Sequence, residues 1–246
     1  MLYWLLKRVL LGPLLKVVWR PRVEGLENVP ASGPAILASN HLSFCDSLFL
    51  PVCVPRRITY LAKAEYFTTP GLKGRIWRWF FSAIGQVPVD RGGADAALDA
   101  LNCGVRLLRQ GELLGIYPEG TRSPDGRLYR GKTGVARLAL DSGAVVLPCA
   151  MIGTNRIQPL GRTLPRLRPR PRIRIGAPLD FSSRGSGAAT GNRFLERAIT
   201  DQIMTEIIRL SGQSYVDVYA AAVKAAAGPG SAHPSMHDRV PGQRAG

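Results

Sequence analysis

A histidine and an aspartate, His41 and Asp46, stand five residues apart directly after the apolar run AILAS. On one unbroken helix a five-residue step turns through about 500°, so the two side chains would point about 140° apart. They can meet if His41 lies in the turn after a strand and Asp46 in the first turn of the following helix. The aspartate would then fix the histidine tautomer, while the other ring nitrogen accepts a proton from an attacking hydroxyl. A histidine that caps a helix end is the alternative.

A second cluster, Tyr-Pro-Glu-Gly-Thr-Arg-Ser at residues 117–123, follows the apolar run LLGIY. Gly120 lets backbone N–H groups approach a ligand, Thr121 carries a hydroxyl, and Arg122 offers a planar fork that matches phosphate oxygens. Glu119 is in place to hold that fork. These residue types predict a phosphate-binding turn at a strand end. A polar turn with no ligand is the alternative.

Both clusters need elements that bring strand ends together. The chain alternates apolar runs with segments of helical period, which predicts an α/β layer structure. The expected strands cover residues 22–25, 35–38, 58–62, 85–89, 113–117, 145–151 and 172–175. The expected helices cover residues 93–111, 132–141, 192–210 and 214–224. The first would bury a stripe of Leu98, Leu101, Val105 and Leu108, and a capping box at Ser214 would open the last.

Length and composition fit one domain with appendages, since 46% of the 246 residues are hydrophobic. We expect a membrane-associating segment at residues 1–20, an α/β domain at 21–225 and a disordered tail at 226–246, which is too poor in apolar residues to order itself. The four cysteines show no CxxC spacing and the chain has three histidines. We therefore expect a reducing compartment and no structural metal.

The chain is strongly basic, with 33 Lys and Arg against 17 Asp and Glu and a formal net charge of +16. Such a charge attracts nucleic acid, anionic lipid headgroups or phosphorylated substrates. Seven arginines lie between residues 155 and 176, with no acid and no aromatic side chain to stack on bases. An anionic membrane surface is therefore the expected partner, and nucleic acid is not.

The first nineteen residues are apolar, but three basic residues and a Gly-Pro pair interrupt them. A spanning helix needs about 20 apolar residues with few charges, and a secretory signal carries its charges first, so neither pattern fits. We expect a helix in the membrane interface, with Tyr3, Trp4 and Trp19 at headgroup depth and the basic side chains snorkelling. An ordinary core helix is the alternative. Residues 71–81, which mix bulky apolar and basic side chains, have the same two interpretations.

Four blocks in a fixed order make the chain resemble the glycerol-phosphate and lysophosphatidic acid acyltransferase family. The matching residues are Asn40 with His41 and Asp46, then residues 85–91, 117–123 and 145–148. Four ordered blocks are more specific than any one of them. The resemblance implies an α/β fold with a mixed, largely parallel sheet flanked by helices, and an N-terminal interfacial membrane-binding helical segment.

The resemblance also implies an enzyme, a 1-acylglycerol-3-phosphate O-acyltransferase of phospholipid biosynthesis. It would move a fatty acyl group from acyl-CoA or acyl carrier protein to a hydroxyl of lysophosphatidic acid or a related glycerol-phosphate acceptor. His41 would be the general base and Asp46 would orient it. The implied ligands of the acceptor phosphate are Arg91, Glu119, Gly120, Thr121, Arg122 and Lys63, with Lys132 as a weaker candidate. The thioester is a co-substrate, and neither a cofactor nor a metal is implied.

Other reactions remain open. Cys45 raises a route in which a thiolate is acylated first, although a free cysteine beside apolar residues is more often a buried filler. A phospholipid transacylase that needs no coenzyme A and a thioester hydrolase would use the same fold. A basic membrane-binding protein without catalysis is more distant. For the acyltransferase, we expect a peripheral or monotopic protein on the cytoplasmic face of a membrane.

Overall fold

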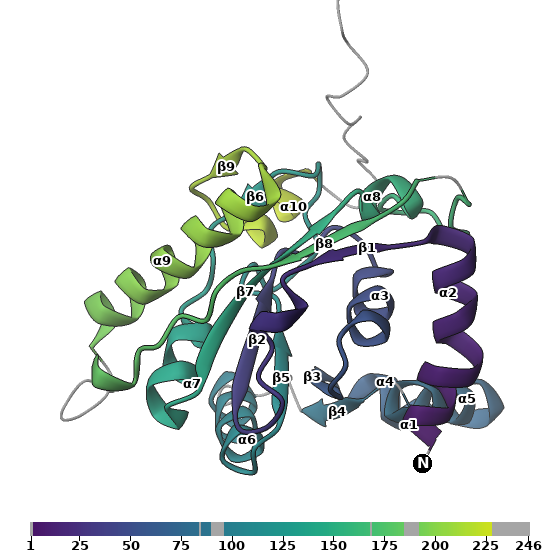
Figure 1. Ribbon diagram of the computed structural model, residues 1–246, viewed down its shortest axis with the longest axis horizontal. Coiled ribbons are helices and arrows are strands. Elements are labelled where there is room, and N and C mark those ends of the chain that lie inside the picture. Colours follow the sequence, from purple (N-terminus) through teal and green to yellow (C-terminus); the bar gives the residue numbers. More distant parts are fainter. Residues whose placement is uncertain (1, 84, 90–95, 168, 185–191, 228–246) are drawn as a thin grey trace, which may run out of the picture.

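A seven-stranded sheet forms the centre of the computed structural model, which describes residues 2–83, 85–89, 96–167, 169–184 and 192–227 (Figure 1). The strands are ordered β1-β8-β7-β2-β5-β3-β4. Their bounds are β1 Arg22–Glu24, β2 Ala35–Ser39, β3 Ile58–Lys63, β4 Gln86–Val89, β5 Leu113–Ile116, β7 Val145–Ile152 and β8 Arg172–Ile175. Neighbours pair in parallel except β7 with β8. The mixed, largely parallel sheet is confirmed, and each expected strand is found.

Helices cover both faces of the sheet, because each parallel connection must cross one face. One face carries α6 (Ala96–Arg109), α7 (Gly134–Ser142) and α9 (Arg193–Ser211), and the other carries α2 (Leu11–Trp19) and α3 (Asp46–Cys53) (Figure 1). In β2, Ile36 and Ala38 join the core beneath the first set, whereas Ala35 and Leu37 join the core beneath the second. Successive side chains of β2 therefore pack into the two cores in turn, and the strand is buried throughout.

The central strands bring the two sequence clusters together. Strand β2 lies between β7 and β5, and Ala38 is paired with Ile116 at the end of β5. The residues that follow β2 and β5 therefore leave the same edge of the sheet. In open parallel sheets this carboxyl-terminal edge is the usual place for ligand sites.

The end of the chain differs from the prediction. The last helix, α10, spans Ala220–Ala227 and thus begins later than residue 214. Before it, β9 (Tyr215–Val216) pairs in parallel with β6 (Leu128–Tyr129), and the carbonyl of Ser214 accepts an N–H from Leu128. The predicted capping box is therefore wrong. The predicted tail lies outside the described residues from 228 onward, and residues 226 and 227 belong to α10.

One further helix prediction is corrected, and the expected N-terminal helical segment is found. Leu98 is 45% exposed and so does not belong to the buried side of α6, whereas Leu108 is buried and Leu101 and Val105 are partly buried. At the N-terminus, α1 (Leu2–Leu5), a π-helical turn (Leu6–Leu10) and α2 follow one another without a break. The widened turn accommodates Pro13, which has no N–H to donate. It also requires Gly12, since a Cβ there would overlap the carbonyl oxygen of Lys7.

The N-terminal helices bury one side against the domain. Tyr3 and Trp19 are buried, and the indole of Trp19 donates to the carbonyl of Arg166 at 2.9 Å. The prediction that these two rings lie at headgroup depth is therefore wrong, whereas Trp4 is exposed. Among the described helices, none has the length and apolarity needed to cross a membrane.

Lys7 also points inward instead of snorkelling. Its Nζ donates to the carbonyls of Val54, the C-terminal cap of α3, and of Arg56, the latter at 3.0 Å. Burial, together with the smaller effects of the neighbouring charges of Lys16 and Arg8, lowers the pKa of Lys7 to about 8. The side chain thus satisfies carbonyls that the end of α3 leaves free and fastens the N-terminal helix to the domain.

Candidate active site

His41 and Asp46 meet across the start of α3. Asp46 is the first residue of that helix and His41 lies in the turn after β2, as the five-residue spacing required. The Nδ1 atom of His41 is 3.0 Å from Oδ2 of Asp46. The same oxygen accepts the N–H groups of Leu42 and Ser43, both at 2.7 Å. A fully buried carboxylate is thus held by three donors around one oxygen.

This contact determines which ring nitrogen is available. When Nδ1 carries its proton toward Asp46, Nε2 is left as the atom that can accept a proton. The His41 side chain is 16% exposed, whereas that of Asp46 is fully enclosed. A substrate can therefore reach the histidine ring but not the carboxylate that orients it.

Aromatic stacking fixes the plane of the imidazole. The His41 ring lies on the ring of Tyr117, with centroids 3.8 Å apart and planes 10° apart. The hydroxyl of Tyr117 is 3.0 Å from Oγ of Ser47, and Tyr60 stacks on Tyr117 at 5.7 Å. Gly115 makes room for this arrangement, because a Cβ there would overlap the Tyr60 ring. Sequence reasoning missed Tyr60 and Ser47, since neither carries a recognisable spacing.

The turn at residues 117–123 is fastened to His41 through the backbone. The N–H of Ser123 donates to the His41 carbonyl at 2.7 Å. Glu119 accepts the N–H of His41 on Oε1 at 3.1 Å and that of Tyr129 on Oε2 at 2.9 Å. Both oxygens of Glu119 therefore hold backbone, and the expectation that they hold the Arg122 fork is corrected. Burial raises the pKa of Glu119 to about 7.

Asn40 connects the site to the neighbouring strand. Its Oδ1 accepts the N–H of Met151 in β7 at 2.7 Å, and its Nδ2 donates to the Met151 carbonyl at 3.0 Å. The same Nδ2 donates to Oε1 of Gln213 at 2.6 Å. Asn40 is fully buried, so its amide extends the sheet past the end of β2. These bonds give a structural reason for an asparagine directly before His41.

Cationic side chains gather around the middle of the turn, at Gly120 and Thr121. Gly120 has a φ of +72°, and a Cβ there would lie 3.3 Å from Nζ of Lys132. Oγ1 of Thr121 accepts a hydrogen bond from Nζ of Lys224 at 2.9 Å. Among the described residues, no carboxylate forms an ion pair with Arg122, Lys132 or Lys224. An anion could therefore bind here without displacing an internal partner.

Two further predicted phosphate ligands, Lys63 and Arg91, lie partly or wholly outside the described residues. Lys63 is the last residue of β3, where its Cα pairs with that of Val89, but its side chain lies outside the described part. Arg91 falls among residues 90–95, which also lie outside it. Lys224 was not predicted as a site residue. It stands far from the turn in the sequence, and no spacing rule connects the two.

Cys45 lies beside the site in surroundings that do not favour a thiolate. The residue is buried, and its Sγ is 3.2 Å from Oε1 of Gln158. Burial raises the pKa of the thiol; the Ser43 hydroxyl opposes part of this rise, and the charge of Asp46 adds a smaller rise. Because the thiolate is the nucleophile, these surroundings favour the filler interpretation over the acylated-cysteine route.

Comparisons with known proteins place the chain among acyltransferases. Residues 20–152, more than half of the chain, match the family model described as Acyltransferase. A chloroplastic 1-acyl-sn-glycerol-3-phosphate acyltransferase of Arabidopsis thaliana is 35% identical over 144 residues, which cover 58% of this chain and 39% of the relative. A 1-acyl-sn-glycerol-3-phosphate acyltransferase of Bacillus subtilis is 32% identical over 136 residues, which cover 54% of this chain and 63% of the relative. The chain thus spans less than two thirds of either relative.

A solved structure extends the likeness to the fold. The crystal structure of PlsC, the 1-acyl-sn-glycerophosphate (LPA) acyltransferase of Thermotoga maritima, matches with a TM-score of 0.59 and 23% sequence identity. The match covers 84% of this chain and 82% of that chain. It therefore includes much of the structure beyond residue 152, and at this identity it establishes the shared fold alone.

Proposed function

Because the chain belongs to the acyltransferase family, we propose that it transfers a fatty acyl group from an acyl thioester to lysophosphatidic acid or a related glycerol-phosphate acceptor in phospholipid synthesis. The single observation that carries the proposal is the contact of 3.0 Å between His41 and Asp46 beside the turn at residues 117–123, near which Arg122, Lys132 and Lys224 form no ion pair with a described carboxylate. Such a site suits an acceptor that carries both a hydroxyl and a phosphate, because a base that can deprotonate the hydroxyl lies next to groups that attract the phosphate.

In the proposed reaction, Nε2 of His41 takes the proton of the acceptor hydroxyl as its oxygen attacks the thioester carbonyl. The tetrahedral intermediate then collapses. The new ester C–O bond remains, the C–S bond breaks, and the leaving thiolate takes the proton from the imidazolium. Asp46 stabilises the imidazolium while it exists. Glu119 acts as a positioning residue, since it holds the backbone N–H of His41.

The acceptor phosphate would bind along the turn. The planar fork of Arg122 can grip two phosphate oxygens, and the hydroxyl of Thr121 and the ammonium of Lys132 can contribute further donors. Gly120 keeps the backbone open to the ligand, because its positive φ excludes most other residues. Arg91 and Lys63 remain predictions of the family resemblance.

The test is a product analysis with purified protein in detergent. Labelled acyl-CoA and acyl carrier protein are offered with lysophosphatidic acid, glycerol 3-phosphate and a monoacylglycerol, and the products are identified by mass spectrometry. We expect a new ester on a phosphate-bearing acceptor and one free thiol for each ester. Free fatty acid without ester would indicate the hydrolase, and chain exchange between phospholipids without thioester would indicate the transacylase. No reaction at all would favour the non-catalytic alternative.

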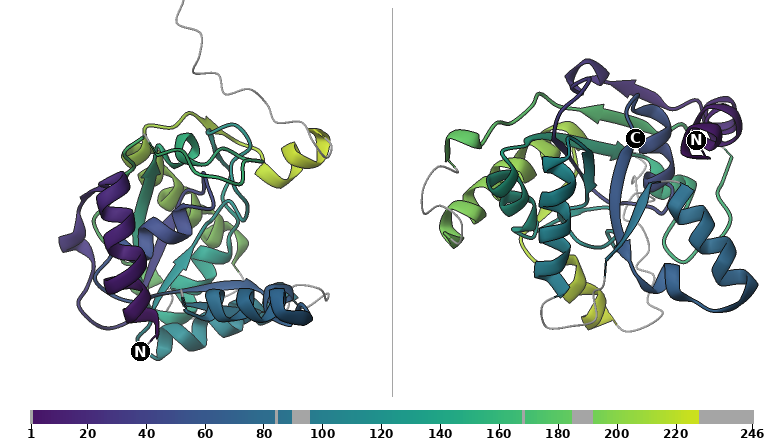
Figure 2. Two further views of the ribbon diagram at one scale, coloured as in Figure 1. Left: turned by 90° about the vertical axis from the view of Figure 1, so that its right-hand side faces the viewer. Right: turned by 90° about the horizontal axis from the view of Figure 1, so that it is seen from below.

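We also infer that the enzyme attaches to a membrane surface by the side that carries α1, α2 and α5 (Gly71–Ala83). Both α2 and α5 lie on the side facing the viewer in the left view of Figure 2. The exposed large apolar side chains on these helices are Trp4, Leu5, Val9, Leu10, Leu14, Val17, Leu72, Ile76 and Trp79. Apolar groups of this size on one side of a protein suit burial at the headgroup boundary.

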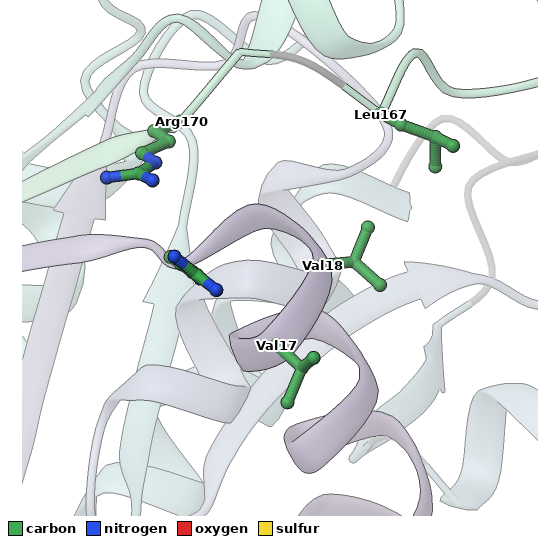
Figure 3. Close-up of a pocket in the computed structure, with 5 residues that line it drawn as sticks. Val17, Val18, Leu167 and Arg170 are labelled. Atoms are coloured by element: carbon green, nitrogen blue, oxygen red, sulfur yellow. The ribbon is translucent and has the colours of Figure 1, made fainter.

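Basic groups accompany this apolar side. A shallow hollow at the end of α2 is lined by Val17, Val18 and Leu167 together with Arg20 and Arg170 (Figure 3). The combination of apolar and cationic side chains suits a bilayer with anionic headgroups. The cytoplasmic face of a membrane, with peripheral or monotopic attachment, remains the predicted location.

Vesicle flotation can test the attachment. Deleting residues 1–19 would remove the buried Tyr3 and Trp19, so substitutions on the exposed side are a cleaner change. We expect the double variant Val9→Asp and Val17→Asp to lose most binding to vesicles of phosphatidylglycerol and phosphatidylcholine, and high salt to weaken wild-type binding. Val218→Asp, at a partly exposed position outside these helices, is the control. Unchanged flotation of the double variant would contradict the inferred side.

A further inference from the structure

Helix α10 brings a lysine to the turn at residues 117–123 from the far end of the chain. Nζ of Lys224 donates to Oγ1 of Thr121 at 2.9 Å, across 103 residues of sequence. The side chain is half-buried. Lys224 also lies outside residues 20–152, the part that matches the family model. The contact therefore adds to the site a cation that none of the four sequence blocks contains.

The charge of Lys224 is not neutralised by an ion pair. Among the described residues, no carboxylate pairs with it. Burial and the nearby charge of Arg122 lower the pKa of Lys224, and the charge of Glu119 partly opposes them. Both oxygens of Glu119 are already engaged by backbone N–H groups. The electrostatics therefore place Lys224 close to Arg122 with no direct acidic partner between them.

Anchoring α10 does not by itself require a cation at this position. Ala220 is completely buried, and the β6 and β9 strands pair directly before the helix. The guanidinium of Arg130 also lies over the Tyr219 ring at 5.6 Å. A neutral donor could make the same bond to Thr121 and would avoid repulsion from Arg122. The cost of two neighbouring like charges is offset when an anion binds between them.

We propose that Lys224 is a phosphate ligand of the acceptor site and selects phosphomonoester headgroups over phosphodiester headgroups. The inference rests on the proposed function, because it assumes that the acceptor phosphate binds at this turn. A phosphomonoester carries about 1.5 to 2 negative charges near neutral pH, whereas a phosphodiester carries one. Since the Coulomb energy scales with ligand charge, a further cation beside Arg122 and Lys132 stabilises the monoester more.

The test compares one neutral and one charged replacement of Lys224. Lys224→Gln keeps a donor for Thr121 and removes the charge, whereas Lys224→Arg keeps the charge. Arg209→Gln is the matched control, since Arg209 is 64% exposed on α9 and pairs with Glu206. The KM values are measured for lysophosphatidic acid, a monoester, and for lysophosphatidylglycerol, a diester, with one acyl thioester. Thermal unfolding of each variant checks that α10 is still in place.

We expect Lys224→Gln to raise the KM for lysophosphatidic acid roughly tenfold, the effect of losing one charge-assisted hydrogen bond, and to raise that for the diester less. Lys224→Arg and Arg209→Gln should stay near wild type. The same KM increase for both acceptors, or a wild-type KM in Lys224→Gln, would overturn the role of Lys224. If wild type acylates no phosphate-bearing acceptor, the proposed function itself fails, and that outcome is separate.

Discussion

Asp46 and Arg122 lie at the same edge of the sheet in opposite surroundings. Asp46 is completely buried, and one of its oxygens accepts three hydrogen bonds. Arg122 is half-buried and forms no ion pair with a described residue. The Oδ2 atom of Asp46 is thus fully engaged, while its buried Oδ1 has no partner among the described residues. At the proposed phosphate end, by contrast, Arg122 has donors that no described carboxylate engages.

This difference agrees with the roles proposed for the two ends. A general base works when its orientation is fixed before the substrate arrives, which requires internal partners for Asp46 and for the His41 ring. An anion site must offer free donors, so internal carboxylates there would compete with the ligand. Glu119 serves both ends, because its oxygens hold the backbone of His41 and Tyr129 and form no ion pair with the nearby cations among the described residues.

The largest expected effect concerns the base end. His41→Ala keeps the backbone N–H that Glu119 binds and removes only the ring, so we expect the rate of transfer to fall by about 10² to 10⁴. Asp46→Asn should lose nearly as much, because an amide can hold the ring in the wrong tautomer. Single-turnover assays with saturating acceptor measure the rate.

Cys45→Ala is the control for these variants and should keep most of the activity, as a filler position would. An acyl group trapped on Cys45 after donor is added without acceptor would contradict direct attack by the hydroxyl. Full activity of His41→Ala would contradict the proposed role of His41 as the general base.

A smaller effect concerns the stability of the residue that connects the two ends. Burial raises the folded-state pKa of Glu119 from 4.5 to about 7, so the folded protein holds this proton more tightly than the unfolded chain does. Its contribution to the free energy of unfolding is therefore complete below about pH 4.5 and is lost as the pH rises through about 7. The loss amounts to at most about 3 kcal/mol.

Urea unfolding of wild type and Glu119→Gln at pH 5 and pH 8 can measure this contribution. The glutamine does not titrate, so the difference in unfolding free energy between the two proteins should change with pH in the stated direction. The same difference at both pH values would show that Glu119 keeps an ordinary pKa, and that its surroundings are less closed than the hydrogen bonds indicate.

The sequence predicted the strands and the contact between His41 and Asp46, for physical reasons. The central strands β2, β5 and β7 are largely buried on both faces, so each is a short apolar run. His41 and Asp46 are only five residues apart at the start of a helix, so local backbone geometry determines whether they meet. The two-residue strands β6 and β9 have no periodicity, and the Ser-x-x-Asp pattern at Ser214 therefore suggested a helix that begins too early.

The phosphate end was less predictable because its contacts are distant in sequence. Lys224 reaches Thr121 across 103 residues, which no local pattern encodes. The role of Glu119 depends on burial and on two backbone partners, and neither is visible in residue types. In the N-terminal helix the composition indicated an amphipathic segment, but which rings face inward depends on the groove that receives them. That is why Tyr3 and Trp19 were assigned to the wrong side.

The central claim is that the turn after β5 binds the acceptor phosphate while His41 activates the acceptor hydroxyl. Arg122→Lys tests it most directly, because lysine keeps the charge and removes the fork. The matched assay compares lysophosphatidic acid with a monoacylglycerol, which lacks the phosphate. We predict that the KM for lysophosphatidic acid rises roughly tenfold with the donor KM unchanged, since a contact to one substrate is lost. Equal slowing with the monoacylglycerol, or an increase in the donor KM alone, would contradict the claim.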